Sequence, residues 1–434
     1  MSEKTERKNS VFASRNFRLV FLGALVSELG ATLSSFAISF YILEISGNNA
    51  LLQGVFLAVC GVVLLLVTPV GGVLGDRFNK AKIMVLCDYI KGALFLLAAA
   101  AMLIAPSHTA HIVILFILGI LGNIIGGIFS PAAGSLFPHI VEEDQLQQAN
   151  AFFTIKSSLL VIIGVLLAGI LYAVLPVTLL FFVVGLCYVG SGISEMFIRY
   201  EHRPAAEKLT LRLALSDMGD GLRYLKTQRA LLTLMGAILF INFFIAPLSG
   251  NFLPYFIKTD VAGAPAYLFD RILTPELWDS VFGMLSGASS LLGAAILSSR
   301  PQKEKCGVSS ARKIGLMALL LIALTAAYYI LVERGVSLNA FLILFAIGCL
   351  LMGYLLSYIN IPISTTIMRV VDRDKLSKVS SIISVLSQGL VPIASVVAGI
   401  ILQLFGSSVL MAFCSAGFTA AALMLLLSKR VREI

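Results

Sequence analysis

The chain has 434 residues, of which 59% are hydrophobic and 13% are charged, and its formal net charge is +9. Soluble globular proteins carry about 25% charged residues, and one soluble core could not bury the many apolar runs of about twenty residues found here. The composition therefore excludes a soluble globular protein, and the runs, which are continuously apolar rather than alternating, exclude a transmembrane β-barrel.

The apolar runs predict twelve transmembrane helices, each long enough to cross a hydrocarbon core about 30 Å thick. Short connections on one side of the membrane alternate with longer, charged connections on the other side. The predicted fold class is an all-α polytopic membrane protein. In chain order, the helices are expected at residues 17–43, 51–75, 82–104, 111–137, 147–175, 177–199, 230–257, 279–299, 313–333, 337–361, 377–403 and 407–428.

The basic residues are distributed unevenly between the two sides. With twelve helices, both termini lie on the same side, which holds 27 of the 32 Lys and Arg residues. The opposite side holds Lys258, Arg271 and Arg334. Under the positive-inside rule, both termini are cytoplasmic. Topology thus accounts for the positive charge, and no nucleic acid partner is expected.

A polar segment divides the chain into two parts. Residues 200–229 form a cytoplasmic linker between an N-terminal half at 1–199 and a C-terminal half at 230–434, each with six helices. Two pseudo-symmetric halves of this kind are an architecture of secondary transporters.

Landmarks recur at a fixed distance in the two halves. Leu146 and Leu376 are 230 positions apart and stand at the start of the fifth and eleventh helices, and Gly169 and Gly399 have the same separation. Their fixed order and similar place in the topology favour an internal duplication over coincidence.

One short connection concentrates glycine and charge. Residues 71–82 read GGVLGDRFNKAK and join the second and third helices. Small residues there let the second helix approach a neighbour closely, and Asn79 tolerates the left-handed turn that ends a helix. Asp76 can meet the positive N-terminus of a helix in the other half, and Arg77 can pair with a neighbouring acid.

This pattern resembles the G-x-L-A-D-R-x-G-R-K signature of the major facilitator superfamily. The resemblance implies a latch that holds the two halves together on the cytoplasmic side and reports the conformational state. The alternative is a solvated basic loop set by topology alone. For the acid inside the third helix, Asp88, a structural role is the preferred alternative. The residues assigned to the latch are Gly72, Asp76, Arg77, Lys80 and Asp88.

Further stretches are similar to the efflux branch that includes macrolide exporters and the enterobactin exporter. They are NFRLVFLG at 16–23, SPAA at 130–133, EDQLQQANAF at 143–152 and GLVP at 389–392. The resemblance implies a monomeric transporter in a bacterial inner membrane. It also implies export of a small lipophilic drug or metabolite by proton antiport through alternating access, with the proton gradient in place of any cofactor.

Two motifs depart from those of proton antiporters in the superfamily. Many carry an arginine in the fourth helix, where this chain has Gly122 and Asn123. A Gly-Pro motif is usual in the fifth helix, where the corresponding stretch, 164–169, lacks proline. The resemblance therefore does not supply the usual coupling residues.

Three ionisable side chains inside the predicted helices are candidates for proton coupling, because a charge within the membrane is costly. Glu28 lies near the middle of the first helix, Lys91 in the third and Lys156 in the fifth. We expect Glu28 to bind and release a proton, with one of the lysines as its partner. The alternatives are a permanent ion pair, a glutamate that binds a cationic substrate, and a Lys156 side chain that extends to the interface.

The substrate cavity is expected between the halves. One acid among apolar walls would suit a lipophilic cation. Aromatic residues of the seventh helix can equally serve for packing or lipid contact. The candidates at suitable depth are Asn123, Asn242, Phe243, Tyr354, Tyr358, Asn360 and Gln388.

The chain lacks the usual signals of an enzyme. There is no P-loop, no nucleophile–base constellation, and no CxxC pair among six scattered cysteines, so neither a metal site nor ATP drive is expected. A transporter of lipid-like molecules or of a nutrient remains an alternative to an exporter. A receptor or scaffold with this fold is the third reading, although a receptor would be expected to add a soluble signalling domain.

Overall fold

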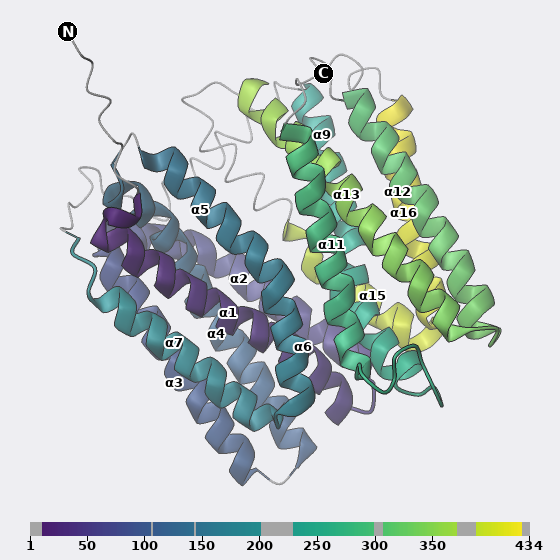
Figure 1. The fold of residues 1–434 in the computed structure, drawn as a ribbon, viewed down its shortest axis with the longest axis horizontal. Coiled ribbons are helices and arrows are strands. Elements are labelled where there is room, and N and C mark those ends of the chain that lie inside the picture. The colour runs from purple at the N-terminus through teal and green to yellow at the C-terminus, as the bar shows by residue number, and fades with distance from the viewer. Residues whose placement is uncertain are drawn as a thin grey trace.

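The computed structural model describes residues 11–105, 107–142, 145–200, 229–298, 307–370 and 388–427. The regular elements among these residues are helices, arranged in two bundles side by side (Figure 1). The linker expected at 200–229 falls almost entirely outside the described residues.

The N-terminal bundle has a short first turn, η1 (Val11–Ala13), followed by six long helices. The fifth of these runs continuously through α5, a π-helical turn η3 and α6. The elements are α1 (Arg15–Ile45), α2 (Ala50–Arg77), α3 (Lys80–Ile104), α4 (His108–Ile140), α5 (Leu146–Leu159), η3 (Leu160–Gly164), α6 (Val165–Val174) and α7 (Val177–Met196).

The C-terminal bundle repeats this plan. Its first long helix is interrupted by two π-helical segments, the first of which follows Pro247. The elements are α9 (Arg229–Pro247), η4 (Leu248–Phe252), α10 (Leu253–Phe256), η5 (Ile257–Val261), α11 (Pro275–Ser298), α12 (Gly307–Tyr328), η6 (Tyr329–Glu333), α13 (Leu338–Val370), α15 (Val391–Phe405) and α16 (Ser407–Leu427).

The expected helical membrane fold is confirmed. Among the described residues, eleven helices are long and apolar enough to cross a membrane, and the shorter α15 lies within the stretch expected for another, 377–403. The first part of that stretch, 377–387, lies outside the described residues.

The helices α11, α12 and α13 differ from their expected bounds at one end. α12 begins at Gly307 rather than at 313, and the other two differences lie beside prolines. α11 begins at Pro275 rather than at 279, because proline fits the first turn of a helix and Glu276 complements the helix N-terminus. α13 continues past Pro362 to Val370 instead of ending at 361. Helices in membranes tolerate an internal proline when neighbours satisfy the freed backbone groups.

Polar residues cap the N-termini of the first four helices. Ser14, Asn49, Asn79 and Ser107 each accept a hydrogen bond from a backbone N–H in the first turn. The left-handed turn expected at Asn79 was wrong, because its φ is −63° and its side chain caps α3 instead.

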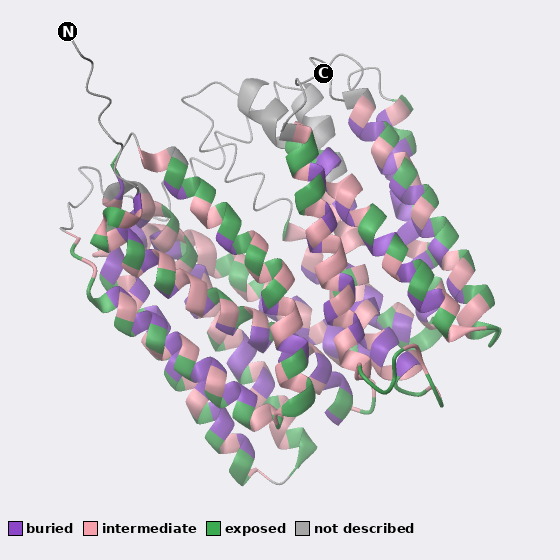
Figure 2. Cartoon of the chain, viewed as in Figure 1, coloured by how far each residue is buried: buried purple, intermediate pink, exposed green. Residues whose placement is uncertain are grey.

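The two ends of the bundle differ in which loops they carry. α1 begins and α16 ends at the same end, which we call the termini end (Figure 1). The short connection between α1 and α2 lies at the opposite end, which we call the far end. Apolar side chains such as Leu66, Leu103 and Leu292 are exposed on the bundle surface (Figure 2), as expected for a surface that contacts lipid.

Small residues bring helices of the N-terminal half close together. Gly23 and Gly30 of α1 lie against α7. A Cβ on Gly92 of α3 would lie 3.1 Å from the carbonyl oxygen of Gly185 in α7, and the reverse substitution would meet the same contact. Glycine permits these close crossings where lipid offers no hydrophobic driving force.

The halves contact each other along α2 with α15 and along α6 with α11. A Cβ on Gly399 would lie 2.7 Å from the carbonyl oxygen of Ala50, the first residue of α2. In the other contact, the Ser280 hydroxyl donates to the carbonyl oxygen of Val165 at 2.9 Å. Ala50 and Ser280 lie at or near the far ends of their helices, so the halves are packed together at the far end.

Candidate functional site

The structure brings together two of the three predicted coupling residues. Lys156 Nζ donates to Oε1 of Glu28 at 2.5 Å, across the contact of α1 with α5. The lysine side chain is 2% exposed and the glutamate side chain is 48% exposed. Lys156 Nζ also lies 4.8 Å from the ring centroid of Phe153. The Lys156 side chain therefore does not extend to the membrane interface, because its ammonium group is paired with Glu28 of α1.

One row of α1 carries this pair and continues to the far end. Residues four apart lie on one side of a helix, and this row faces the helix formed by α5, η3 and α6. Its middle rings stack on each other, with centroids 4.7 Å apart, and pack against Tyr172 of α6. The row consists of Glu28, Thr32, Phe36, Phe40 and Glu44.

The third predicted coupling residue, Lys91, lies elsewhere. Its Nζ sits 5.3 Å from the ring centroid of Tyr188 in α7 and 5.8 Å from that of Phe129 in α4. This position is within the N-terminal half, between α3, α4 and α7. Of the two lysines expected as possible partners of Glu28, Lys156 is therefore the one that pairs with it in this structure.

The glycines before the charged loop divide into two kinds. A Cβ on Gly71 would overlap the backbone of Gly127 in α4, and one on Gly75 would lie 3.5 Å from the Cα atom of Ala132. Nothing lies within 4 Å of the corresponding position on Gly72. The close approach expected here therefore depends on Gly71 and Gly75, and Gly72 does not contribute to it.

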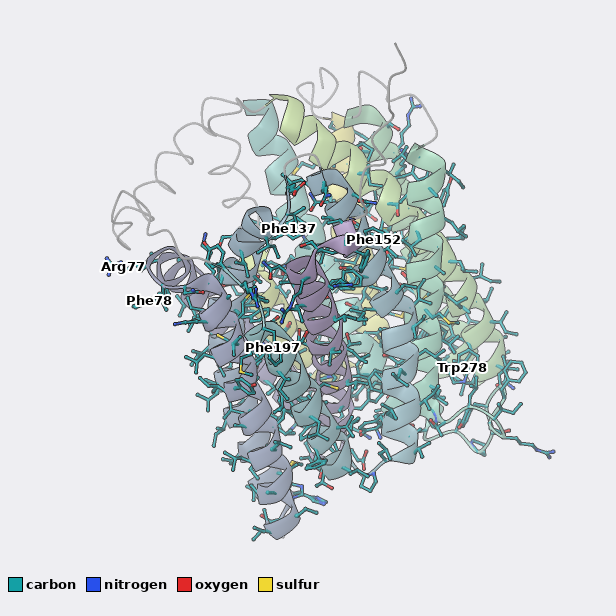
Figure 3. All side chains as sticks on the ribbon, turned by 60° about the vertical axis from the view of Figure 1, so that its left-hand side comes forward. Arg77, Phe78, Phe137, Phe152, Phe197 and Trp278 are labelled. Atoms are coloured by element: carbon teal, nitrogen blue, oxygen red, sulfur yellow. The ribbon has the colours of Figure 1, made fainter. Side chains whose placement is uncertain are left out.

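The charged latch residues are described in part. Arg77 is exposed at the end of α2 (Figure 3), whereas Lys80 in the first turn of α3 is buried. The side chain of Asp76 lies outside the described residues, so its predicted partner in the other half stays a prediction. Asp88 is buried between α3 and α7, away from the surface of the loop.

A network at the far end joins the halves and was missed by the sequence analysis. Lys258 of η5 pairs with Glu44 of α1 and with Glu276 of α11, each at 2.9 Å. The Tyr172 hydroxyl donates to Glu44 at 3.0 Å. The sequence did contain a signal for this network. Lys258 is one of the few bases on this side, and the acids Glu44 and Glu276 lie near helix ends on the same side.

Replacing Lys258 by glutamine is expected to weaken closure of the far end by about 1–2 kcal/mol. It removes two ion pairs in which the Lys258 side chain is only 12% exposed, and even exposed pairs contribute up to about 1 kcal/mol each. The ratio of closed to open molecules should fall by roughly 5- to 30-fold. Distances between spin labels at Gly47 and Arg271 would measure this shift. Arg334→Gln is the matched control, since Arg334 contacts Tyr329 within its own half. An unchanged distance distribution in Lys258→Gln would contradict this role.

Two of the predicted substrate residues lie together on α13. The rings of Tyr354 and Tyr358 have centroids 4.8 Å apart. Lys313 of α12 places its Nζ 4.6 Å from the Tyr358 centroid and donates to the Tyr358 carbonyl oxygen at 3.4 Å. Lys313 was expected at the start of a helix at 313–333, but α12 begins at Gly307, so Lys313 lies within the helix and adds a cation to this pair.

The other predicted substrate residues are spread over several helices. Asn123 donates from Nδ2 to the carbonyl oxygen of Gly119 one turn earlier. Phe243 packs on two neighbouring rings, which agrees with its packing alternative. Asn242 is half-buried on α9, and Asn360 and Gln388 are exposed.

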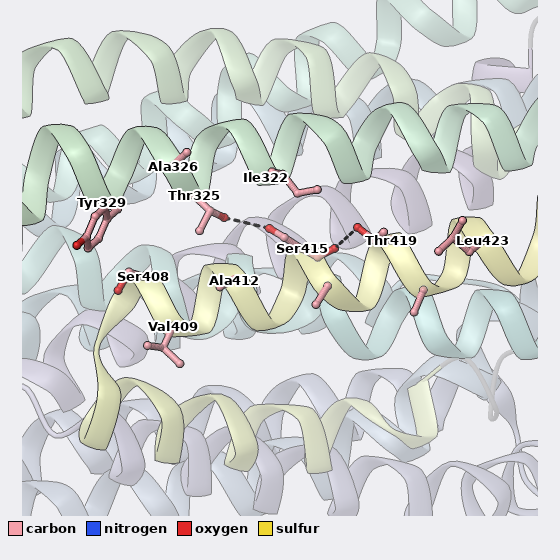
Figure 4. A pocket seen from close by; sticks show the side chains of 12 residues that line it. Ile322, Thr325, Ala326, Tyr329, Ser408, Val409, Ala412, Ser415, Thr419 and Leu423 are labelled. Atoms are coloured by element: carbon pink, nitrogen blue, oxygen red, sulfur yellow. Dashed lines mark hydrogen bonds between the residues drawn. The ribbon is translucent and has the colours of Figure 1, made fainter.

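A groove of about 780 Å³ lies between α12 and α16 and contains none of the predicted residues. Figure 4 shows its walls, where the hydroxyls of Thr325 and Ser415 are 3.0 Å apart. Exposed apolar residues such as Ile322 and Leu423 border it, within two membrane-spanning helices. The groove lies on the side of the C-terminal half that faces away from the N-terminal half (Figure 1). This position fits contact with lipid chains and does not fit a substrate site between the halves.

Comparison with known families gives a match over most of the chain. The profile described as Major Facilitator Superfamily matches residues 20–393. An uncharacterized MFS-type transporter of Bacillus subtilis (strain 168), YvqJ, is 23% identical over 91% of this chain and 87% of its own length. A second from the same organism, YkuC, is 22% identical over 66% of this chain, and the match spans 65% of its own length.

Solved structures share the fold at low identity. A bacterial homologue of the iron transporter ferroportin in the inward-facing state has a TM-score of 0.72 and 16% identity over 96% of this chain and 99% of its own. The outward-facing state has a TM-score of 0.61 at 16% identity over 94% and 98%. The nucleoside transporter NupG has a TM-score of 0.72 at 11% identity over 94% and 98%.

Proposed function

The chain belongs to the major facilitator superfamily, and from this premise we propose that it exports a lipophilic drug-like compound or metabolite in exchange for protons. It is a membrane transporter of this type, so the proposal concerns the driving ion, the direction and the class of substrate. The ion pair of Glu28 and Lys156 is the observation that carries the proposal.

The pair suits proton exchange because it joins a partly exposed acid to a buried base. The ammonium group 2.5 Å away stabilises the charged carboxylate. A proton that reaches Glu28 would remove the negative charge and leave the Lys156 cation unpaired between α1 and α5, which is unfavourable in the membrane. Movement of α5 relative to α1 would therefore be linked to protonation of Glu28.

We place the termini end in the cytoplasm, following the distribution of basic residues. The far end is then the outer side, and the contacts of α2 with α15 and of α6 with α11 close it. This supports an inward-facing state in which the charged pair is the form that has released its proton to the cytoplasm. The higher TM-score to the inward-facing ferroportin homologue agrees with this state.

The transport cycle in this proposal is alternating access about a site between the halves. In the outward-facing state, Glu28 would accept an external proton as the substrate leaves. The halves would then rock, the network around Lys258 would close the outer side, and Glu28 would pair again with Lys156. The small-molecule substrate and the proton are thus exchanged in opposite directions.

The experiment that tests the proposal uses purified protein in liposomes with an imposed pH gradient. Internal pH is followed while macrolides, lipophilic cations and siderophores are added in turn. Proton flux that depends on one of these compounds is the expected result. Transport of a compound without proton flux would rule out proton antiport. If lipids or nucleosides are transported and none of the panel is, the proposed class of lipophilic drug-like substrates is wrong.

Replacing Asp76 by asparagine is expected to slow turnover by roughly tenfold while leaving substrate affinity within about twofold. The latch would act on the equilibrium between conformations rather than on the bound substrate. Turnover and Kd of the same variant, measured with the substrate found above, check this prediction. Asp270→Asn is a control at the opposite end, and a large loss of affinity with normal turnover in Asp76→Asn would contradict the latch.

A further inference from the structure

A second pair of acids lies buried inside the N-terminal half. Asp88 of α3 and Glu195 of α7 are each 1% exposed. Both carboxylate oxygens of Glu195 and Oδ2 of Asp88 are buried without a hydrogen-bond partner. The Glu195 side chain packs against Gly23 of α1, where a Cβ would lie 2.9 Å from its Cγ atom. The pair therefore sits where α1, α3 and α7 meet.

The polar groups nearby do not balance two negative charges. The Ser191 hydroxyl lies beside Asp88, but it donates to the carbonyl oxygen of Gly23 at 2.9 Å. Lys91 is the nearby cation, and its ammonium group lies over the rings of Tyr188 and Phe129 without an ion pair among the described residues. Cys87 and Tyr188 add no positive charge.

Two buried carboxylates cannot both be ionised at low cost when the one nearby cation, Lys91, forms no ion pair among the described residues. An unpaired buried charge is so unfavourable that the group takes up a proton instead, and two neighbouring carboxyl groups that share a site behave in this way. A protonated carboxyl group also gains an O–H group, which can donate a hydrogen bond to the other carboxylate. One shared proton would thus satisfy oxygens that are otherwise without partners.

A cavity lies between Glu195 and the termini end. Its volume is about 350 Å³, and Glu195 forms part of its wall. The rest of the cavity is lined by Asn79 and Lys82 at the start of α3, by Tyr89 about two turns beyond Lys82, and by Tyr200 after α7. Lys82 is exposed, so water from this end reaches the neighbourhood of Glu195.

We propose that Asp88 and Glu195 form a second proton-binding site, which holds one proton between them and exchanges it with the termini end. The site is separate from Glu28, which lies on the opposite row of α1 and faces α5. It goes beyond the proposed exchange of substrate and proton, since it requires neither a substrate nor Lys156. Its proton would be lost when α7 and α1 move apart and water reaches both carboxylates.

Chemical modification of the wild-type protein tests the site directly. Dicyclohexylcarbodiimide reacts with protonated carboxyl groups in apolar surroundings, and peptide mass spectrometry locates the product. At pH 7 we expect at least about tenfold more product on Asp88 or Glu195 than on Glu333, because the reagent needs a protonated carboxyl group in apolar surroundings and the Glu333 side chain is exposed. Equal and negligible modification of all three carboxyl groups would overturn the proposal.

The dependence of stability on pH gives a second readout that does not involve transport. A folded state that binds a proton absent from the unfolded state loses stability as pH rises. The melting temperature of the wild type should therefore fall between pH 6 and pH 9, and Glu195→Gln should remove most of that fall. Glu333→Gln is the matched control and should behave as the wild type. If Na⁺ or Ca²⁺ restores stability at pH 9 in the wild type and not in Glu195→Gln, the pair holds a metal cation and the proposal is wrong.

Discussion

Replacing Glu28 by glutamine is expected to reduce proton-driven export by at least about 100-fold while the protein still inserts and folds. Glutamine keeps the size of the side chain and can still accept a hydrogen bond from Lys156, but it cannot exchange a proton at physiological pH. The measurement is substrate-dependent change of internal pH in liposomes, with the wild type beside the variant. We expect the substrate-dependent proton flux to fall, while the equilibrium affinity for a neutral substrate stays largely unchanged.

The buried lysine supplies a further control for this result. Glu28→Gln leaves the buried Lys156 charge without its counter-ion. Breaking a fully buried pair destabilises a protein by about 3–5 kcal/mol, and the loss here is expected to be smaller because the Glu28 side chain is 48% exposed. The double variant Glu28→Gln with Lys156→Gln should recover stability without recovering coupling. Glu333→Gln, an exposed acid at the far end, should leave both properties unchanged. Undiminished proton-coupled export in Glu28→Gln would exclude this residue as the proton carrier.

Replacing Gly399 by leucine is expected to prevent closure of the far end and to lower transport by more than about tenfold. The backbones of α2 and α15 are so close that even a Cβ would lie 2.7 Å from the carbonyl oxygen of Ala50. Overpacking of a tight contact costs about 1–3 kcal/mol or more, and here the halves can avoid it by staying apart. The distance between spin labels at Gly47 and Arg271 should increase.

A glycine in open surroundings provides the matched control. Gly190 on α7 has nothing within 4 Å of a Cβ position, so Gly190→Leu should change neither the distance nor the rate. A normal closed distance and normal transport in Gly399→Leu would show that this contact does not determine the state of the far end. Gly61→Leu tests the same interface nearer its middle, where the neighbour is Pro392.

Much of the fold follows from the sequence because a bilayer imposes simple rules. Continuous apolar runs give helices, and an even number of them places both termini on the same side. Boundaries were less certain where proline intervened, since Pro275 starts a helix and Pro362 lies within one. Asn79 was placed correctly at a junction but with the wrong conformation, because capping α3 satisfies its side chain better than a left-handed turn.

The candidate site was predictable at the level of single residues. An acid within an apolar helix identified Glu28, and two lysines, in the third and fifth predicted helices, were possible partners. The choice of Lys156 over Lys91 depends on which face of α5 meets α1, and helix periodicity in one chain does not fix the rotation of one helix against another. The network around Lys258 was missed for the same reason, since its members are 18 to more than 200 positions apart.

The sequence by itself determined that this protein is a helical membrane transporter of two related halves, with an ionisable group in its first helix. These properties depend on composition, run length and local motifs, which act over a few turns of one helix. The tertiary structure decided which charges meet, where the two halves pack together, and that Asp88 and Glu195 are both buried. Such contacts depend on crossing angles and rotations set by packing between helices far apart in the chain.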